Sequence, residues 1–442
     1  MQGFAACITA FFRLKEHNTS IRTELVGGFT TYMAMAYVVF VVPGMLVDAG
    51  MPREASITAL ILITAATTML MGLWANFPVA VAPGLGISAV FVYYVCGTMN
   101  LPWQTALGAV FISGLIFLLL TVTHLRQMII DAVPMDLKYA TIAGIGTFIG
   151  FIGLKNCGII ISHPHNFVAL GDLTAPPALL AMTGICLIGI MMERGIRGAL
   201  PLGIITVTLL GMVTGEAPVP RSLDDIITFS IPSLSPLMGQ VDIMAALNYG
   251  IFSIVFTITI VDLFDNIGTL IGLSRRAGFM DKDGHIKGLD KALITDSLGA
   301  MGSSFMGMPT VTTYIESASG IAAGGRTGLT AVFTALFFLL TLFFVPLIGL
   351  VPGYATAPAL VIVAPLMMQE VAHVKFSEFR IALPVLLTII MMPLTFSIAA
   401  GLGFGFASYV LLHAFTGRAK EISPTMWVIT GCFAVNFALR IH

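Results

Sequence analysis

Apolar stretches close to the roughly 20 residues that a helix needs to cross a bilayer recur along the whole chain, separated by short polar links. Only 10% of the 442 residues are charged, whereas soluble globular domains carry about 25%. A soluble fold has no core large enough to bury so many apolar segments. The sequence therefore predicts an all-α polytopic membrane protein in contact with the lipid bilayer.

Fourteen membrane-spanning segments are predicted from these stretches. A further apolar stretch at 426–439 is short and ends at Arg440, which favours an interfacial helix over a fifteenth span. The predicted spans cover residues 26–47, 56–75, 79–97, 102–123, 136–155, 176–192, 198–215, 246–272, 290–306, 309–324, 327–350, 354–372, 377–397 and 400–416.

The distribution of basic residues supports this count and gives an orientation. Lys and Arg accumulate in the cytoplasmic loops of membrane proteins. With a cytoplasmic N-terminus, only Arg53, Lys155 and Arg221 fall in outside segments. Both termini are therefore predicted in the cytoplasm of a multi-pass inner (plasma) membrane protein. The inside segments hold Arg13, Lys15, Arg22, Arg126, Lys138, Arg194, Arg197, Arg275, Arg276, Lys282, Lys287, Lys291, Arg326, Lys375, Arg380, Arg418 and Lys420.

A weak internal repeat divides the chain into halves. The stretch Thr105–Leu119 resembles Thr327–Thr341, about half the chain later. Fourteen spans split into seven and seven, and an odd-numbered repeat must invert its second copy. Inverted repeats are typical of secondary transporters, which bind their substrate near the membrane midplane between the halves.

Two predicted spans in corresponding positions look discontinuous. The third contains Pro78, Pro83, Gly84 and Gly86, and in the tenth Pro309 is followed by a β-branched run. Each could be a short extended piece followed by a half-helix. Two such pieces could pair and satisfy backbone groups that lipid cannot, while the half-helix N-termini direct free N–H groups at a ligand. Simple kinks are the alternative, since Gly and Pro are common in membrane helices.

Acidic residues are rare within the predicted spans. A charge at the bilayer centre costs about 2.5–3.5 kcal/mol, so an intramembrane carboxylate suggests function. Asp265 and Glu316 are predicted to accept hydrogen bonds from the N–H groups of a neutral ring and to carry a proton. Asp262, one turn before Asp265, either shares the proton coupling or clamps two helices. Two further acids near predicted helix ends are expected to make cap or loop contacts, and these are Glu24 and Asp296.

Other classes of chemistry have no motif in the sequence. The five cysteines are scattered and form no CxxC pair, as expected of small apolar packing residues. No phosphate-binding loop, HExxH sequence or catalytic triad spacing occurs. The near-neutral net charge of −1 predicts no nucleic-acid partner. We therefore expect neither an enzyme nor a cofactor or metal.

Five stretches carry distinctive motifs: TELVGGFTTYMAMAYVVFVVPGML (Thr23–Leu46), MGLWANFPVAVAPGLG (Met71–Gly86), LFDNIGTLIG (Leu263–Gly272), KALITDSLGA (Lys291–Ala300) and TTYIESASGIAAGGRTGLTA (Thr312–Ala331). They resemble the nucleobase:cation symporter superfamily, in its adenine/guanine/hypoxanthine permease branch. The resemblance covers nearly the whole chain.

The resemblance implies a fold and a domain division. It implies fourteen helices in two inverted seven-helix repeats, with short antiparallel strands in spans three and ten, and a homodimer. A core domain would comprise residues 26–123 (spans 1–4) and 246–350 (spans 8–11). A gate domain would comprise 124–216 (spans 5–7) and 351–417 (spans 12–14), with terminal segments at 1–25 and 418–442.

The resemblance also implies site residues. The family's two carboxylates fall on Asp265 and Glu316, and Thr269 stands where related uracil permeases carry a histidine. Backbone at Ile315–Glu316 and Leu85–Gly86 would contact the ring, with Tyr37 as a further contact. Many adenine-type members carry asparagine where this chain has Ser88, yet the motif at Leu263–Gly272 is closer to the adenine type, so the purine stays open.

Together these observations predict a secondary active transporter that imports a purine nucleobase by proton symport through alternating access. An anion transporter of the same architecture, for sulfate or bicarbonate, is the alternative, although two facing acids argue against it. A channel fits paired broken helices and buried acids less well. A membrane enzyme would need a catalytic constellation that the sequence does not offer.

Overall fold

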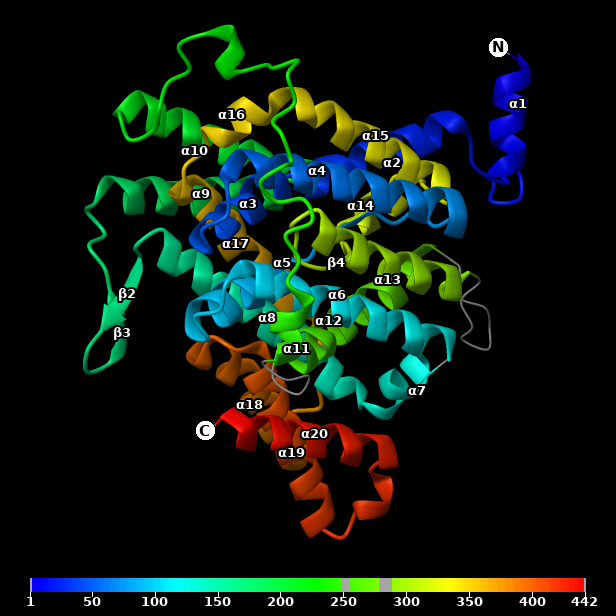
Figure 1. The fold of residues 1–442 in the computed structure, drawn as a ribbon, viewed down its shortest axis with the longest axis vertical. Coiled ribbons are helices and arrows are strands. Elements are labelled where there is room, and N and C mark those ends of the chain that lie inside the picture. Colours follow the sequence, from blue (N-terminus) through cyan, green and yellow to red (C-terminus); the bar gives the residue numbers. More distant parts are fainter. Residues whose placement is uncertain (1, 124, 249–253, 278–287, 441–442) are drawn as a thin grey trace.

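The computed structural model of the chain describes residues 2–123, 125–248, 254–277 and 288–440. Helices dominate it (Figure 1). Within the described residues, eight helical segments are long and apolar enough to cross a membrane. These are Ile21–Asp48, Arg53–Ala75, Trp103–Val122, Met135–Asn156, Pro176–Glu193, Gly328–Gly349, Gly353–His373 and Ile398–Phe415.

The described residues of the first half form ten α-helices, two π-helices and three strands. Its elements are α1 (Gln2–Phe11), α2 (Ile21–Met35), α3 (Val38–Asp48), α4 (Arg53–Leu70), a π-helix (Met71–Ala75), β1 (Val81–Pro83), α5 (Leu85–Ala89), a second π-helix (Val90–Thr98), α6 (Trp103–Val122), α7 (Leu125–Ala132), α8 (Met135–Asn156), β2 (Ile160–His163), β3 (Phe167–Leu170), α9 (Pro176–Glu193) and α10 (Ala199–Thr214).

The second half follows a 3₁₀ turn (Leu223–Asp225) and the short α11 (Ile243–Asn248). Its elements are α12 (Phe256–Ala277), α13 (Leu289–Phe305), β4 (Val311–Thr313), α14 (Ser317–Ala322), α15 (Gly328–Thr341), a 3₁₀ turn (Leu342–Phe344), α16 (Val345–Gly349), α17 (Gly353–Met368), a 3₁₀ turn (Gln369–His373), α18 (Phe379–Thr395), α19 (Ile398–Phe415), a 3₁₀ turn (Ala419–Glu421) and α20 (Pro424–Arg440).

Eight of the fourteen predicted spans coincide with the long apolar segments, and the other six fall on other elements, which in spans three and ten are a strand followed by a helix. The count of fourteen spans stays a prediction, and the elements differ from it in three further ways. The first span is two helices, α2 and α3, because the α-helical pattern breaks at Ala36 and Tyr37. The eighth was predicted from residue 246, but α11 ends at Asn248 and α12 begins at Phe256, and residues 249–253 lie outside the described part. The links contain α7 and the β2–β3 hairpin, neither of which was predicted.

Two of the basic residues counted for the orientation, Lys282 and Lys287, also lie outside the described residues.

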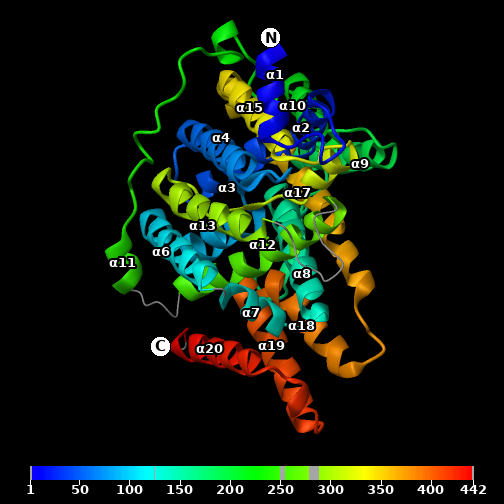
Figure 2. The ribbon, with the colours of Figure 1, turned by 90° about the vertical axis from the view of Figure 1, so that its right-hand side faces the viewer.

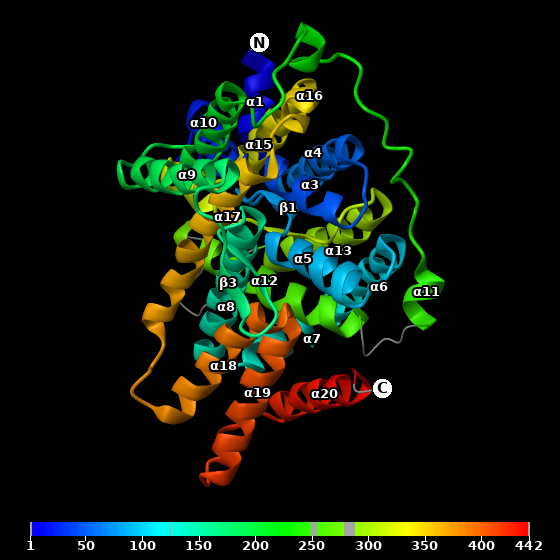
Figure 3. The ribbon, with the colours of Figure 1, turned by 90° about the vertical axis from the view of Figure 1, so that its left-hand side faces the viewer.

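Helices from the two halves lie side by side (Figures 2 and 3). In one group α15 packs against α2 and α4, and α13 packs against α6. In a second group α17 packs against α8 and α9, and α18 packs against α8 and α19. The C-terminal α20 crosses α19 and also contacts α7. Its placement at the membrane interface stays a prediction.

Glu24 ties the first half to the second at the N-terminus of α15. Its buried carboxylate accepts hydrogen bonds from the backbone N–H groups of Thr327, at 3.2 Å, and Thr330, at 3.1 Å. Asn76 adds a third acceptor, with its Oδ1 2.8 Å from the N–H of Gly328. These are groups that the first turn of a helix leaves without partners. The predicted capping role of Glu24 is confirmed.

Candidate functional site

Two short strands from opposite halves of the chain pair in the middle of the protein. β1 and β4 run antiparallel, with Val81 opposite Thr313 and Pro83 opposite Val311. Two further backbone bonds extend the pairing, from the Gly84 N–H to the Thr310 carbonyl at 3.2 Å and from the Tyr314 N–H to the Ala80 carbonyl at 3.0 Å. Paired strands in the two broken segments were predicted, and the prediction is confirmed.

Side chains satisfy the outer edges of this strand pair. Thr68 Oγ1 lies 2.9 Å from both the N–H and the carbonyl oxygen of Val81. The Tyr314 hydroxyl donates to the Pro83 carbonyl at 2.6 Å, and Ser317 Oγ accepts from the Ala80 N–H at 3.0 Å. Irregular backbone at membrane depth is tolerated only where its polar groups find partners inside the protein. These side chains therefore allow two three-residue strands to interrupt buried helices.

Asp265 lies beside the point where β1 gives way to α5. Its side chain is only 9% exposed. A Cβ atom added to Gly84 would lie 2.5 Å from Thr312 Cγ2, too close for any other residue, and 3.4 Å from Asp265 Oδ2, an ordinary contact distance. Among the described residues no hydrogen bond reaches the Asp265 carboxylate. A buried carboxylate requires partners, and this one retains its capacity to accept hydrogen bonds.

Glu316 lies at the other end of the strand pair, immediately before α14. The hydroxyl of Tyr37 donates a hydrogen bond of 2.6 Å to Glu316 Oε1. Tyr37 is fully buried, and it sits at the break between α2 and α3. The structure therefore brings together two of the residues that the sequence selected. The neighbouring Ile315 is 43% exposed, in contrast to the buried strand before it.

Hydrogen bonds between side chains connect α12 to β4. Thr269 Oγ1 lies 2.7 Å from Thr313 Oγ1. Asn266 Oδ1 accepts a hydrogen bond of 2.9 Å from the same Thr313 hydroxyl. Thr269 therefore contacts β4, in the broken tenth segment, through the Thr313 side chain. Asn266 was not predicted, and the one sequence signal for it is its place next to Asp265 in a membrane-depth helix.

The start of α5 lies against the second group of helices. A Cβ atom added to Gly86 would lie 2.8 Å from Ile145 Cγ2 in α8 and 3.7 Å from Ile398 Cδ1 in α19. Leu85 is nearly buried, and Ser88 is completely buried. The Ser88 hydroxyl has no hydrogen-bond partner in the part of the chain that the structure describes. The predicted contacts of α5 therefore lie where the two groups of helices meet.

Asp262 shares the helix with Asp265 but has different neighbours. The hydroxyl of Thr310 donates a hydrogen bond of 3.0 Å to Asp262 Oδ2. Arg126 and Asp296 are close enough to act on it electrostatically. The Arg126 guanidinium forms an ion pair of 3.0 Å with Asp296, and both side chains are 1% exposed. The same guanidinium lies 4.7 Å from the centre of the Phe117 ring.

This ion pair corrects the interpretation of Asp296 as a cap or loop contact. The residue lies in the middle of α13 and is buried. Arg126, predicted in a cytoplasmic link, is buried as well. The reason is α7, an unpredicted helix that returns the chain toward the protein after α6 and inserts Arg126 between α6 and α13.

Comparison with known proteins places this arrangement in a family. The model of a family described as "Permease family" (Xan_ur_permease) matches residues 22–403. The chain belongs to the xanthine/uracil permease family. It is therefore a multi-pass membrane transporter and not an enzyme.

Curated relatives match this permease over nearly its whole length. It is 41% identical to the adenine permease AdeP of Escherichia coli, over 97% of this chain and 95% of the relative. It is 39% identical to the guanine/hypoxanthine permease PbuG of Bacillus subtilis, over 97% and 98% respectively. The resemblance inferred from the sequence motifs is confirmed.

A solved structure shares the fold of the permease. The transmembrane domain of the cyanobacterial bicarbonate transporter BicA superposes with a TM-score of 0.64, covering 88% of this chain and 97% of that domain at 16% identity. At that identity the likeness shows the fold alone. The mostly helical membrane fold with short strands is thus shared by the permease and BicA.

Proposed function

We propose that this permease imports purine nucleobases by proton symport through alternating access. The observation that carries the proposal is the Asp265 carboxylate, buried at the junction of β1 and α5 beside Gly84. Its acceptor capacity is unused by the described residues. The adenine and guanine/hypoxanthine substrates of the relatives supply the class of ligand.

A purine suits two carboxylates separated by a strand pair. The neutral base is flat, and its edges carry N–H groups that a carboxylate can accept. We assign Asp265 to one edge and Glu316 to the other. Tyr37 orients Glu316 through its 2.6 Å hydrogen bond. Rejection of rings without matching N–H groups follows, because such a ring leaves a buried acceptor unpaired.

The remaining predicted contacts have supporting roles in this proposal. Backbone groups of Leu85 and Gly86, at the start of α5, and of Ile315, before α14, would contact the faces and edges of the ring. Ser88 would contact it through its unpartnered hydroxyl. Thr269 would act through Thr313, holding β4 at a fixed distance from α12.

Proton coupling is assigned to the same acids. A carboxylate that takes up a proton outside and releases it inside couples base uptake to the proton gradient. Asp265 and Glu316 are the primary proton carriers, and Asp262 is a secondary one. Asp262 has one oxygen bonded to Thr310 and the other without a described partner, so it can bind a proton without losing its hydrogen bond.

Alternating access would come from movement of a core domain against a gate domain. The core would contain residues 26–123 and 246–350, and the gate 124–216 and 351–417, in fourteen spans forming two inverted repeats. The packing of α13 on α6 and of α17 on α8 supports this division. We also propose a homodimer in the inner (plasma) membrane with both termini cytoplasmic, as the charge bias predicts.

An anion transporter of the same fold remains the alternative. The likeness to a bicarbonate transporter supports only the fold, and an anion would meet two acids at the strand pair. A purine is therefore favoured. Adenine, guanine and hypoxanthine all stay candidates, because relatives named for each have similar identity to this chain.

Uptake measurements test the proposal. Labelled adenine, guanine, hypoxanthine and uracil would be supplied to cells that lack their own purine permeases, with and without a protonophore. We expect uptake of at least one purine that stops with the protonophore and slows as the external pH rises. An uptake rate that the protonophore does not change would refute proton coupling. A well-expressed protein that transports no base would refute the substrate class.

A further inference from the structure

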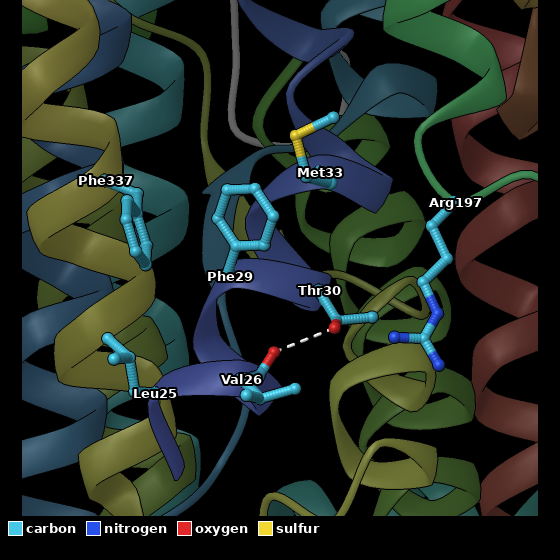
Figure 4. A pocket seen from close by; sticks show the side chains of 7 residues that line it. All are labelled: Leu25, Val26, Phe29, Thr30, Met33, Arg197 and Phe337. Atoms are coloured by element: carbon cyan, nitrogen blue, oxygen red, sulfur yellow. Dashed lines mark hydrogen bonds between the residues drawn. The ribbon is translucent and has the colours of Figure 1, made fainter. Parts of the chain in front are cut away.

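An apolar cavity of about 310 Å³ lies on the surface formed by α2, α15 and the turn between α9 and α10 (Figure 4). Its volume is in the range of small-molecule sites. The walls are apolar apart from one cation at the rim. They are formed by Leu25, Val26, Phe29, Met33, Phe337 and Arg197.

The polar atoms of the walls are already satisfied. Thr30 also borders the cavity, but its hydroxyl donates to the Val26 carbonyl at 2.8 Å. Leu25, Val26 and Phe29 are 40–49% exposed on one side of α2. In a chain that spans a bilayer, an apolar surface of this kind faces the acyl chains of lipids.

Arg197 gives the cavity its one charge. In Figure 4 its guanidinium extends along the wall next to Thr30. Among the described residues no carboxylate forms an ion pair with it. The turn that carries it is fixed against α2. Gly198 has a φ of +76°, which favours glycine, and a Cβ there would lie 2.6 Å from Met33 Cε.

We propose that this cavity binds an anionic phospholipid. One acyl chain would lie against Phe29, Met33 and Phe337, and the headgroup phosphate would bind the Arg197 guanidinium. An arginine fork is well matched to phosphate oxygens. In the predicted orientation Arg197 faces the cytoplasm, where anionic lipids concentrate and where basic pockets between helices bind their headgroups.

The site lies between parts of the chain that the domain proposal separates. α2 and α15 belong to the proposed core, and the α9–α10 turn belongs to the proposed gate. A lipid held there contacts both. Lipid binding itself does not depend on the transported substrate, so it can be tested whether or not the purine proposal holds.

Native mass spectrometry of the purified full-length protein tests the proposal. The protein would be equilibrated with mixed micelles that contain phosphatidylglycerol and phosphatidylcholine in equal amounts. We expect the parent protein to retain phosphatidylglycerol preferentially and R197Q to retain it roughly fivefold less, as expected for one basic group near the surface. R197K keeps the charge but loses the fork, so its retention should fall between those of the parent and R197Q. The matched control is R194Q, which removes a nearby exposed charge that does not line the cavity.

A second variant fills the cavity without changing charge. V26W replaces an exposed wall residue and should also reduce phosphatidylglycerol retention, while monodispersity on size exclusion verifies folding. Equal retention by the parent, R197Q and V26W would overturn the site. Retention of phosphatidylcholine as strong as that of phosphatidylglycerol in the parent would overturn the headgroup assignment. A loss in R194Q as large as in R197Q would show that only diffuse surface charge is involved.

Discussion

Two carboxylates three residues apart on α12 occupy opposite environments. Asp262 is completely buried, bonded to Thr310 and close to the Arg126–Asp296 ion pair. Asp265 lies beside Gly84 at the junction of β1 and α5, where the described residues supply no hydrogen bond. The Asp262 carboxylate is hydrogen-bonded within the protein, whereas the Asp265 carboxylate can still accept hydrogen bonds from a ligand. We therefore propose that Asp262 stabilises the packing of α12 and that Asp265 binds substrate, because different elements face the two side chains.

The largest expected effect is a loss of stability at the Arg126–Asp296 ion pair, which lies close to Asp262. R126M removes the cation and leaves Asp296 buried without its partner. Breaking a buried ion pair in this way destabilises a protein by about 3–5 kcal/mol. Thermal and denaturant unfolding in detergent measure the loss.

Two further variants sharpen that test. The double variant R126M/D296N should recover most of the lost stability, because no uncompensated charge remains. R418M breaks an exposed pair with Glu421 at 3.4 Å and should cost less than about 1 kcal/mol. An R126M protein as stable as R418M would show that the buried pair does not hold the fold.

The next effect separates the two acids in transport. D265N should lower purine uptake roughly 10–100-fold, because hydrogen bonds to a charged group contribute about 1.5–3 kcal/mol each. D262N keeps an acceptor for Thr310 and should still exchange labelled purine across the membrane, with reduced gradient-driven accumulation. Initial-rate and exchange assays on equally expressed variants measure both. Equal defects in the two variants would remove the distinction.

A smaller effect is expected at Glu316. Y37F removes the hydroxyl that donates to Glu316 at 2.6 Å. The KM for purine should rise up to roughly tenfold with less change in the maximal rate, since a hydrogen bond to a charged partner contributes about 1.5 kcal/mol or more. Concentration-dependent uptake measures it. An unchanged KM would mean that Tyr37 does not position the carboxylate.

The smallest effect is expected at the side-chain hydrogen bonds between α12 and β4. T269V keeps the shape and removes the hydroxyl 2.7 Å from Thr313. A hydrogen bond between neutral groups contributes about 0.5–1.5 kcal/mol, so a small drop in thermal stability is expected. Uptake should fall less than in Y37F. A loss of uptake as severe as that of D265N would place Thr269 in direct contact with the base.

The sequence predicted those features that depend on local patterns. Proline and glycine around Pro83 and β-branched residues after Pro309 indicated the strand pair. The rarity of membrane-depth acids selected Asp265 and Glu316, whose binding role stays a prediction. The capping role of Glu24 also followed from its position.

Features that depend on distant contacts were not predictable. Arg126 and Asp296 are 170 residues apart, and the sequence predicted Arg126 in a polar link and Asp296 near the end of a span. Their pairing arises from α7, a helix of only eight residues in a link between spans, which was not predicted. Likewise, nothing local to Asn266 indicates that β4 will lie against it. Such contacts become visible only once the halves of the chain pack together.

Equilibrium binding of labelled purine to the purified protein tests the central claim most directly. The parent, D262N and D265N proteins would be compared in detergent at one pH. We expect the parent and D262N to bind with similar affinity and D265N to bind roughly 10–100-fold more weakly, the loss of one charge-assisted hydrogen bond. Unchanged affinity in a folded D265N protein would contradict the assignment of this carboxylate as the substrate acceptor.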